Sequence, residues 1–232
     1  MRHSNRRGCF LRRFRVGMGK ITAIEPQARH AHRFNLYVDD QFALGVSEIL
    51  AASLRVGQTL TADDLKHLEA EEGFEAAREK ALRFLEPRPR SAQEVRQHLA
   101  KKKIAREVID QVIARLTDAG LLDDAAFAQY WVENREQFKP RAARALRFEL
   151  KRKGLSNADI AGAVGEIDES ESAYRAAQAR AQRWCGLERR AFLEKLTAFL
   201  VRRGFSYAVA KEAAARAWKE CRAENSEVEL PR

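Results

Sequence analysis

The sequence predicts a mainly α-helical protein with tandem three-helix repeats, three units in an elongated stack, preceded by a small N-terminal antiparallel β-hairpin or three-stranded sheet. Residues 150–156 (LKRKGLS) recur in variant form at 99–105 and 200–206, a period of 51 and 50 residues. Such a period is typical of repeat proteins whose units stack on one another. Residues 34–46 alternate between apolar and polar side chains, as half-buried strands do. From about residue 75 onward apolar residues recur at helical spacing.

Each copy of the recurring segment matches the end of one helix and the start of the next. A leucine and a basic run come first, and Gly154 or Gly204 follows where helices often end in a left-handed residue. Ser156 or Ser206 can then cap the next helix. Lys103 replaces the glycine in the first copy, so we expect that helix end to be strained or differently shaped.

The net charge of +10 is concentrated at one end of the chain, since residues 1–20 hold seven basic and no acidic residues. The other residues therefore carry only +3, and local patches must support any argument for nucleic-acid binding. We expect residues 1–19 to be a disordered basic leader. It has no apolar core of a secretory signal, and it either resembles an organelle transit peptide or precedes a true start at Met18.

The chain has three cysteines, Cys9, Cys185 and Cys221, with no C-x-x-C pair. An odd count without framework spacing favours reduced thiols in the cytoplasm. No apolar run approaches the roughly 18 residues that a membrane-spanning helix needs. We therefore expect a cytoplasmic protein.

Residues 20–74 are predicted to form the β-hairpin with accompanying helices. Strands are expected at residues 21–25, 34–38 and 42–46. Three short strands are marginally stable alone, so the helices expected at 47–54 and from Thr61 should cover them. Thr61 and Asp64 have the spacing of a capping box, and the acidic helix that follows is expected to present a solvated face.

The helical part divides into repeats with punctuated ends. Boundaries are expected at 75–122, 123–168 and 169–222, with a frayed tail at 223–232. Pro87 and Pro89 should end the first helix of the first repeat. Asp123 and Asp124 should cap the start of the second repeat. A paired-carboxylate catalytic site is the weaker alternative there, because adjacent helical residues point in different directions.

Several motifs, taken in order, resemble the RecX family of recombination regulators. They are Arg88-Pro-Arg-Ser91, residues 120–128 (GLLDDAAFA), Arg135, residues 149–155 (ELKRKGL) and Arg203-Gly-Phe-Ser206. The match covers roughly residues 80–220, and the hairpin at 37–45 resembles that of the longer members of the family. Pro140 to Ala142 departs from the family, in which many members carry glycine, and Lys103 departs likewise.

The resemblance implies a fold of three stacked three-helix units and a function in homologous recombination. Family members lie in the groove of the RecA protein filament, where they reach RecA protomers and the single-stranded DNA within. They inhibit the recombinase, ATPase and coprotease activities of RecA and so modulate recombination and the SOS response. The expected partners of this chain are therefore the RecA filament and its DNA, and we expect it to act as a monomer.

Residues 135–153 form the densest basic cluster, with eight basic and two acidic residues. Arg144, Arg147 and Lys151 share a helix face that could follow a phosphate backbone; a solvated helix face is the alternative. The candidates for contact with RecA or DNA are Arg88, Arg90, Lys101, Lys102, Lys103, Arg135, Lys139, Arg141, Arg144, Arg147, Lys151, Arg152, Lys153, Arg202 and Arg203.

Aromatic residues offer a second kind of contact, since Tyr130, Trp131 and Phe148 could stack on bases. Their helical spacing among apolar neighbours favours core packing instead. The sequence has no Gly-rich phosphate loop, serine-nucleophile motif or Cys/His constellation. It thus predicts no catalytic residue, no metal site and no cofactor. The alternative function is a general nucleic-acid-binding helical module that acts without RecA.

Overall fold

The computed structural model describes residues 18–28 and 30–228, and it divides into two compact units. The first unit comprises residues up to 86 together with 98–115, and the second comprises 87–97 and the residues from 116 onward. The leader expected at 1–19 lies outside the described residues except for its last two positions. Gly19 already begins the first strand.

The first unit contains a four-stranded antiparallel sheet in the order β3-β2-β1-β4. The strands are β1 (Gly19–Gln27), β2 (His30–Val38), β3 (Gln41–Ser47) and β4 (Thr59–Leu60). The tight turn between β2 and β3 holds Asp39 and Asp40 at φ values of 49° and 60°, a left-handed pair that suits a two-residue hairpin. The three predicted strands are confirmed. The fourth was missed, because a two-residue strand shows no alternation.

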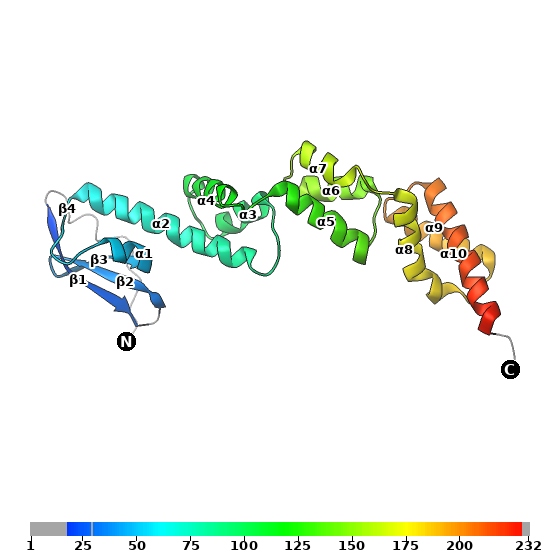
Figure 1. Cartoon of the computed structure of the whole chain (residues 1–232), viewed down its shortest axis with the longest axis horizontal. Coiled ribbons are helices and arrows are strands. Elements are labelled where there is room, and N and C mark those ends of the chain that lie inside the picture. The colour runs from blue at the N-terminus through cyan, green and yellow to red at the C-terminus, as the bar shows by residue number, and fades with distance from the viewer. Residues whose placement is uncertain (1–17, 29, 229–232) are drawn as a thin grey trace. The chain divides into compact units, whose positions relative to one another are not determined.

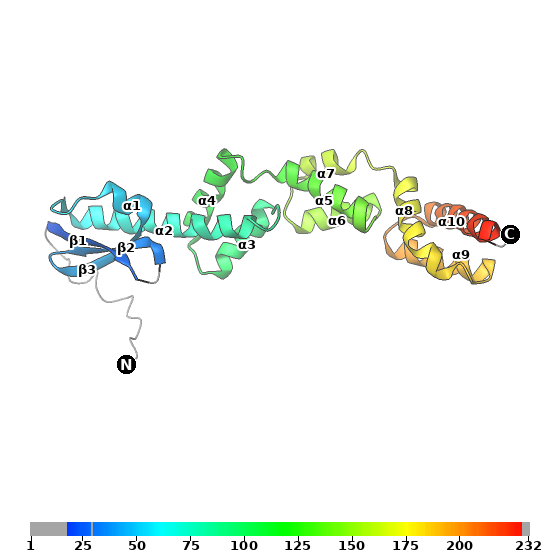
Figure 2. The ribbon, with the colours of Figure 1, turned by 60° about the horizontal axis from the view of Figure 1, so that its bottom comes forward.

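Helices α1 (Glu48–Ser53) and α2 (Ala62–Leu85) cover one face of this sheet (Figure 2). The buried core includes Ile21 and Leu36 from the sheet and Leu65 from α2. Thr61 and Asp64 form the predicted capping box at the start of α2. The expected packing of both helices on the sheet is therefore confirmed.

Helix α2 is longer than expected, with 24 residues that pass without a break through the boundary placed at residue 74. It ends at Leu85, just before Pro87, as predicted. Its last turns precede α3 (Ala92–Lys101) and α4 (Arg106–Asp118). Helix α2 therefore packs on the sheet and also forms the first helix of the first repeat. No feature of the sequence around Gly73 indicated this continuity.

The second unit contains two further sets of three helices (Figure 1). They are α5 (Asp124–Phe138), α6 (Ala143–Arg152) and α7 (Asn157–Val164), then α8 (Glu169–Ala181), α9 (Arg189–Arg202) and α10 (Tyr207–Val228), with a short 3-10 turn η1 (Gln182–Trp184) after α8. The first set buries Phe127, Leu146 and Leu150, and the second buries Phe192 and Leu196. Tandem three-helix repeats are confirmed. Helix α10 continues into the segment for which we expected a frayed tail.

The recurring segments end their helices in the predicted left-handed conformation, with φ values of +85° at Gly154 and +99° at Gly204. A Cβ on Gly154 would lie 2.4 Å from Cβ of Gln93, and a Cβ on Gly204 would lie 3.0 Å from Cβ of Ala145. Lys103 adopts the same conformation, at φ +59°, and is exposed. The first helix end is therefore strained but not differently shaped.

Neighbouring repeats meet through carboxylates that cap each other's helices. Oδ1 of Asp124, the first residue of α5, accepts a 2.8 Å hydrogen bond from the backbone N–H of Ala92 at the start of α3. Oε1 of Glu169, the first residue of α8, accepts an equivalent 2.8 Å bond from Ala143 at the start of α6. Each repeat thus satisfies one free N–H of the preceding middle helix. Asp123 caps its own helix as predicted, whereas Asp124 caps the helix of another repeat.

The ends of the middle helices complete the same junction. Ser91 Oγ donates a 2.7 Å hydrogen bond to the carbonyl of Lys153, at the end of α6. The backbone N–H of Ala142 lies 3.4 Å from the carbonyl of Arg203, at the end of α9. Two successive junctions inside the second unit therefore join equivalent positions, the first through a serine hydroxyl and the second through a backbone amide.

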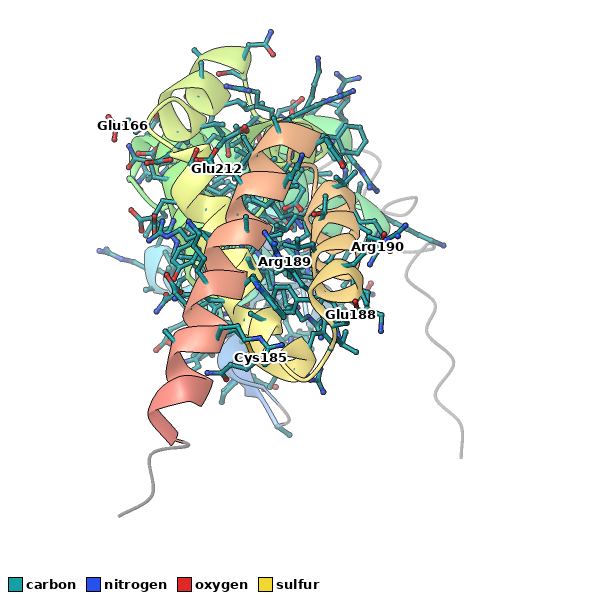
Figure 3. All side chains as sticks on the ribbon, turned by 90° about the vertical axis from the view of Figure 1, so that its right-hand side faces the viewer. Glu166, Cys185, Glu188, Arg189, Arg190 and Glu212 are labelled. Carbon is teal, nitrogen blue, oxygen red and sulfur yellow. A yellow bond between two sulfur atoms is a disulfide. The ribbon has the colours of Figure 1, made fainter. Side chains whose placement is uncertain are left out.

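Cys185 and Cys221 form a disulfide with a Cα–Cα distance of 5.9 Å. Cys185 lies at the connection between α8 and α9, close to the Glu188 and Arg189 that begin α9 (Figure 3), while Cys221 is buried on α10. The expectation of reduced thiols is wrong for this pair, because the fold brings together two cysteines that are 36 residues apart in the sequence. Cys9 lies outside the described residues.

Candidate nucleic-acid interface

A surface groove of about 480 Å³ lies between α3, α5 and α6 in the second unit. Its lining is rich in cations and aromatic rings, among them Trp131, Arg135, Arg141, Phe148, Arg152 and Lys153. All six come from the segment that the sequence identified as most basic or from its flanking helix α5. Half of the eight basic residues of the cluster are therefore gathered on one concave surface.

Glu149 organises one wall of the groove. Its Oε2 accepts hydrogen bonds of 2.8 Å from Trp131 Nε1 and from Arg135 Nε. Its Oε1 forms a 2.8 Å ion pair with Arg141. Because one carboxylate fixes two guanidinium groups and an indole ring from different elements, the cations are held in place before any ligand arrives.

Glu94 has the same function on the opposite wall, where it pairs with Lys153 at 2.7 Å and with Arg88 at 3.2 Å. Burial opposes ionisation of this carboxyl, but hydrogen bonds from Arg88 and Lys153 outweigh it and lower the pKa of Glu94. Glu94 therefore stays charged at neutral pH. Arg90 lies in the same short segment as Arg88, just before α3. Burial lowers the pKa of Arg90, and repulsion from the charge of Arg88 lowers it further.

Aromatic rings alternate with the cations along the groove. The Arg135 guanidinium lies 4.4 Å from the centre of the Trp131 ring, and Lys153 Nζ lies 4.0 Å from it. The Arg152 guanidinium lies 5.9 Å from the Phe148 ring. These distances are typical of cation–π contacts, which orient the charged groups further.

Phe148 differs from the sequence expectation, because 64% of it is exposed. The prediction of core packing is therefore wrong for Phe148, which lies on the solvent-exposed side of α6 next to the groove. Trp131 is half-buried and has one edge against Phe127 of the core. Tyr130 is also half-buried, while Trp184 and Trp218 pack against the core of the third repeat as expected.

Arg144, Arg147 and Lys151 form a separate surface, here called the α6 stripe. All three are exposed, and none has an ion pair within the described part of the chain. With 3.6 residues per turn, they lie on the side of α6 opposite Glu149 and Lys153. The predicted cluster is therefore divided between the groove, where Arg135, Arg141 and Lys153 are paired with carboxylates, and the stripe, where no cation is paired among the described residues.

The other predicted candidates are more scattered. Lys139 ends α5 and Arg202 is the last residue of α9, and both are exposed. Lys101, Lys102 and Lys103 are exposed at the end of α3 and belong to the first unit. The structure thus does not show them on the same surface as the groove.

Arg203 lies at the junction of the second and third repeats, where its Nη1 donates a 3.1 Å hydrogen bond to the carbonyl of Pro140. Its guanidinium lies 4.8 Å from the Phe199 ring, and the guanidinium of Arg180 lies 5.3 Å from the same ring. Burial lowers the pKa of Arg203, and repulsion from Arg141, Arg180 and Arg135 lowers it further. Sequence reasoning missed Arg180 and Phe199, because neither belongs to a basic run or a motif.

No helix in residues 18–28 and 30–228 is long and apolar enough to span a membrane. Within the same ranges, no group of three or more His, Cys, Asp or Glu side chains is arranged to hold a metal ion.

Three family models match successive parts of the chain. The RecX N-terminal domain matches residues 19–61, the first RecX three-helix domain matches 77–116, and the second matches 123–164. Regulatory protein RecX of Lacticaseibacillus paracasei is 30% identical over 193 residues, which are 81% of this chain and 80% of the relative. The chain belongs to the RecX family. Regulatory protein RecX of Listeria welshimeri is 27% identical over 206 residues, 87% of this chain and 77% of the relative.

Solved structures support the fold alone. A crystal structure of regulatory protein RecX covers 84% of this chain and 98% of its own length, with a TM-score of 0.66 at 23% identity. RecX from Lactobacillus salivarius covers 63% of this chain and 97% of its own, with a TM-score of 0.54 at 21% identity. The family resemblance and the fold class predicted from the sequence are confirmed. The relatives of this RecX-family chain are named as regulatory proteins rather than as enzymes.

Proposed function

We propose that the chain binds the RecA–DNA filament and inhibits the recombinase, ATPase and coprotease activities of RecA. By doing so it modulates homologous recombination and the SOS response. The observation that carries the proposal is the cation-rich surface of the second repeat in a member of the RecX family. The groove and the α6 stripe together present positive charge on more than one side of α6.

The chemistry of that surface suits a polyanionic filament. Guanidinium groups of Arg135 and Arg141 are already oriented by Glu149, so little side-chain entropy is lost when an anion binds. Each phosphate that these cations neutralise also releases counterions, which favours binding at low salt. The protein then acts by occupying the filament, as a cytoplasmic monomer, and needs no catalytic residue or cofactor.

The decisive experiment is a titration of the full chain into RecA filaments on single-stranded DNA, with RecA ATPase as the readout. Dose-dependent inhibition at substoichiometric chain-to-RecA ratios supports the proposal. The same basic surface also favours a second function, a general nucleic-acid-binding module. Tight binding to naked single-stranded DNA at physiological salt, with unchanged RecA ATPase, would establish that alternative.

A further inference from the structure

Three cation–aromatic sets follow one another across the second and third repeats. Arg152 contacts the ring of Phe148, Arg135 and Lys153 both contact the ring of Trp131, and Arg180 and Arg203 both contact the ring of Phe199. We call these eight residues the cation–aromatic track.

Arg141 makes the track continuous. It lines the groove and pairs with Glu149, which also holds Arg135. Arg203 lies against the same segment, since its Nη1 donates a hydrogen bond to the carbonyl of Pro140 and its own carbonyl accepts one from Ala142. The segment that carries Arg141 therefore connects the groove of the second repeat with the junction to the third, within a single compact unit.

Charge along the track is incompletely neutralised. Glu94 and Glu149 pair with Lys153, Arg135 and Arg141. Arg152, Arg180 and Arg203 have no carboxylate partner among the residues that the structure describes. Arg180 and Arg203 share one ring and are both half-buried, so an anion placed between them would relieve their repulsion.

We propose that the cation–aromatic track is a binding surface for single-stranded nucleic acid. Arg152, Arg180 and Arg203 contact phosphates, and Phe148 stacks on a base. The inference rests on the proposed function and specifies which face of the chain meets the DNA of the filament.

The aromatic residues favour nucleic acid over an acidic peptide. The carboxylates of an acidic peptide need only cations as partners, whereas single-stranded nucleic acid is typically bound by a positive groove with interleaved aromatic rings. Phe148 is 64% exposed beside the groove, and an exposed ring in that place has a natural partner in an unstacked base. Trp131 and Phe199 are half-buried and each contacts two cations, so they hold the phosphate-binding groups, whereas Phe148 is exposed and contacts only Arg152, at 5.9 Å.

The test measures binding of the full chain to a fluorescently labelled oligo-dT by anisotropy over a range of salt concentrations. Phe148→Ala should weaken binding about tenfold at one salt concentration, because stacking on one base is lost. Phe148→Tyr, which keeps a stacking ring, should stay within about twofold of the wild type. Arg180→Gln should weaken binding and reduce the slope of log affinity against log salt by about 0.7.

Arg189→Gln is the matched control, since it removes one exposed arginine charge at the start of α9, outside both the track and the α6 stripe. It should leave the salt slope unchanged. Circular dichroism and thermal unfolding confirm that each variant is folded; Phe148 and Arg189 are exposed, so neither change opens a cavity. Wild-type affinity in both Phe148→Ala and Arg180→Gln, equal losses in Arg180→Gln and Arg189→Gln, or no binding of naked oligo-dT by the wild type would overturn the inference.

RecA ATPase measured on the same proteins separates this inference from the proposed function. If the wild type inhibits RecA and the track variants bind DNA normally, the track is excluded as the DNA-binding surface and the proposed function stands. If the wild type has no effect on RecA, the proposed function is excluded, whatever the DNA binding of the track variants.

Discussion

Gly154→Ala is expected to be the most destabilising single-methyl addition in the junctions between repeats. At φ +85° any residue with a Cβ is strained, at a cost of about 1–2 kcal/mol. The added methyl would also lie 2.4 Å from Cβ and 2.7 Å from Cγ of Gln93, and such overpacking costs about 1–3 kcal/mol. The two effects together predict a loss of about 3 kcal/mol in the free energy of unfolding.

Two related substitutions calibrate this value. The methyl of Gly204→Ala would lie 3.0 Å from Cβ of Ala145 and 3.4 Å from Cβ of Ala142, a looser fit than at Gly154, so the substitution should cost about 2 kcal/mol, mainly from backbone strain. Lys103→Gly relieves the backbone strain of a lysine at φ +59°, but the glycine also increases the conformational entropy of the unfolded chain. The two effects oppose each other, so the free energy of unfolding should stay within about 0.5 kcal/mol of the wild-type value.

Urea unfolding, followed by circular dichroism and tryptophan fluorescence, measures these differences. A double-mutant cycle with Gln93→Gly adds the decisive comparison, because it removes the atoms that the new methyl meets. Gly154→Ala should cost about 1 kcal/mol less in the Gln93→Gly background than in the wild type. The reasoning fails if Gly154→Ala is no more harmful than Gly204→Ala, or if the cycle shows no coupling.

Four further outcomes are expected. Asp124→Ala should lower the free energy of unfolding by about 1 kcal/mol through loss of the cap on Ala92, as measured by urea unfolding. Burial raises the pKa of the Asp124 carboxyl above its ordinary value of 3.8 in the folded protein. Ionisation of this carboxyl therefore destabilises the fold as the pH rises through that range. When the pH is lowered from 7 to 4, the free energy of unfolding of the wild type should accordingly increase relative to that of Asp124→Asn. Arg144→Glu combined with Lys151→Glu should weaken inhibition of RecA ATPase and flatten its salt dependence, and unchanged inhibition would exclude the α6 stripe. Reduction of the Cys185–Cys221 disulfide should lower the thermal unfolding midpoint, with Cys221→Ser insensitive to reductant as the control.

Much of the fold could be predicted because local chemistry determines it. The left-handed ends at Gly154 and Gly204, the stop before Pro87 and the cap at Asp123 each depend on residues within one turn of helix. What the sequence did not show depends on contacts between distant segments. The disulfide joins Cys185 to Cys221, and the carboxylate of Asp124 caps α3, and neither partner is marked by spacing.

The candidate site was predicted in composition but not in arrangement. A count of charges cannot show that Glu149 neutralises Arg135 and Arg141 while Arg144 stays unpaired. It also cannot find Arg180, which stands alone in the sequence and meets Arg203 only across the Phe199 ring. Phe148 was misjudged because it lies close in sequence to Leu146 and Leu150, but positions two residues apart on a helix differ by about 200°, so Phe148 faces away from these buried leucines.

The junction geometry also explains why the middle helix of the third repeat is longer than the other two. Pro89 and Pro140 lie 51 residues apart, each three residues before the first residue of a ten-residue middle helix. The equivalent position in the third repeat is Arg190, which imposes no such start. Helix α9 accordingly begins at Arg189 and has 14 residues, about one turn more at its N-terminal end than α3 and α6 have. Replacing Arg190 with proline should therefore shorten α9 at its N-terminal end, a change that amide hydrogen exchange of its first turn would detect.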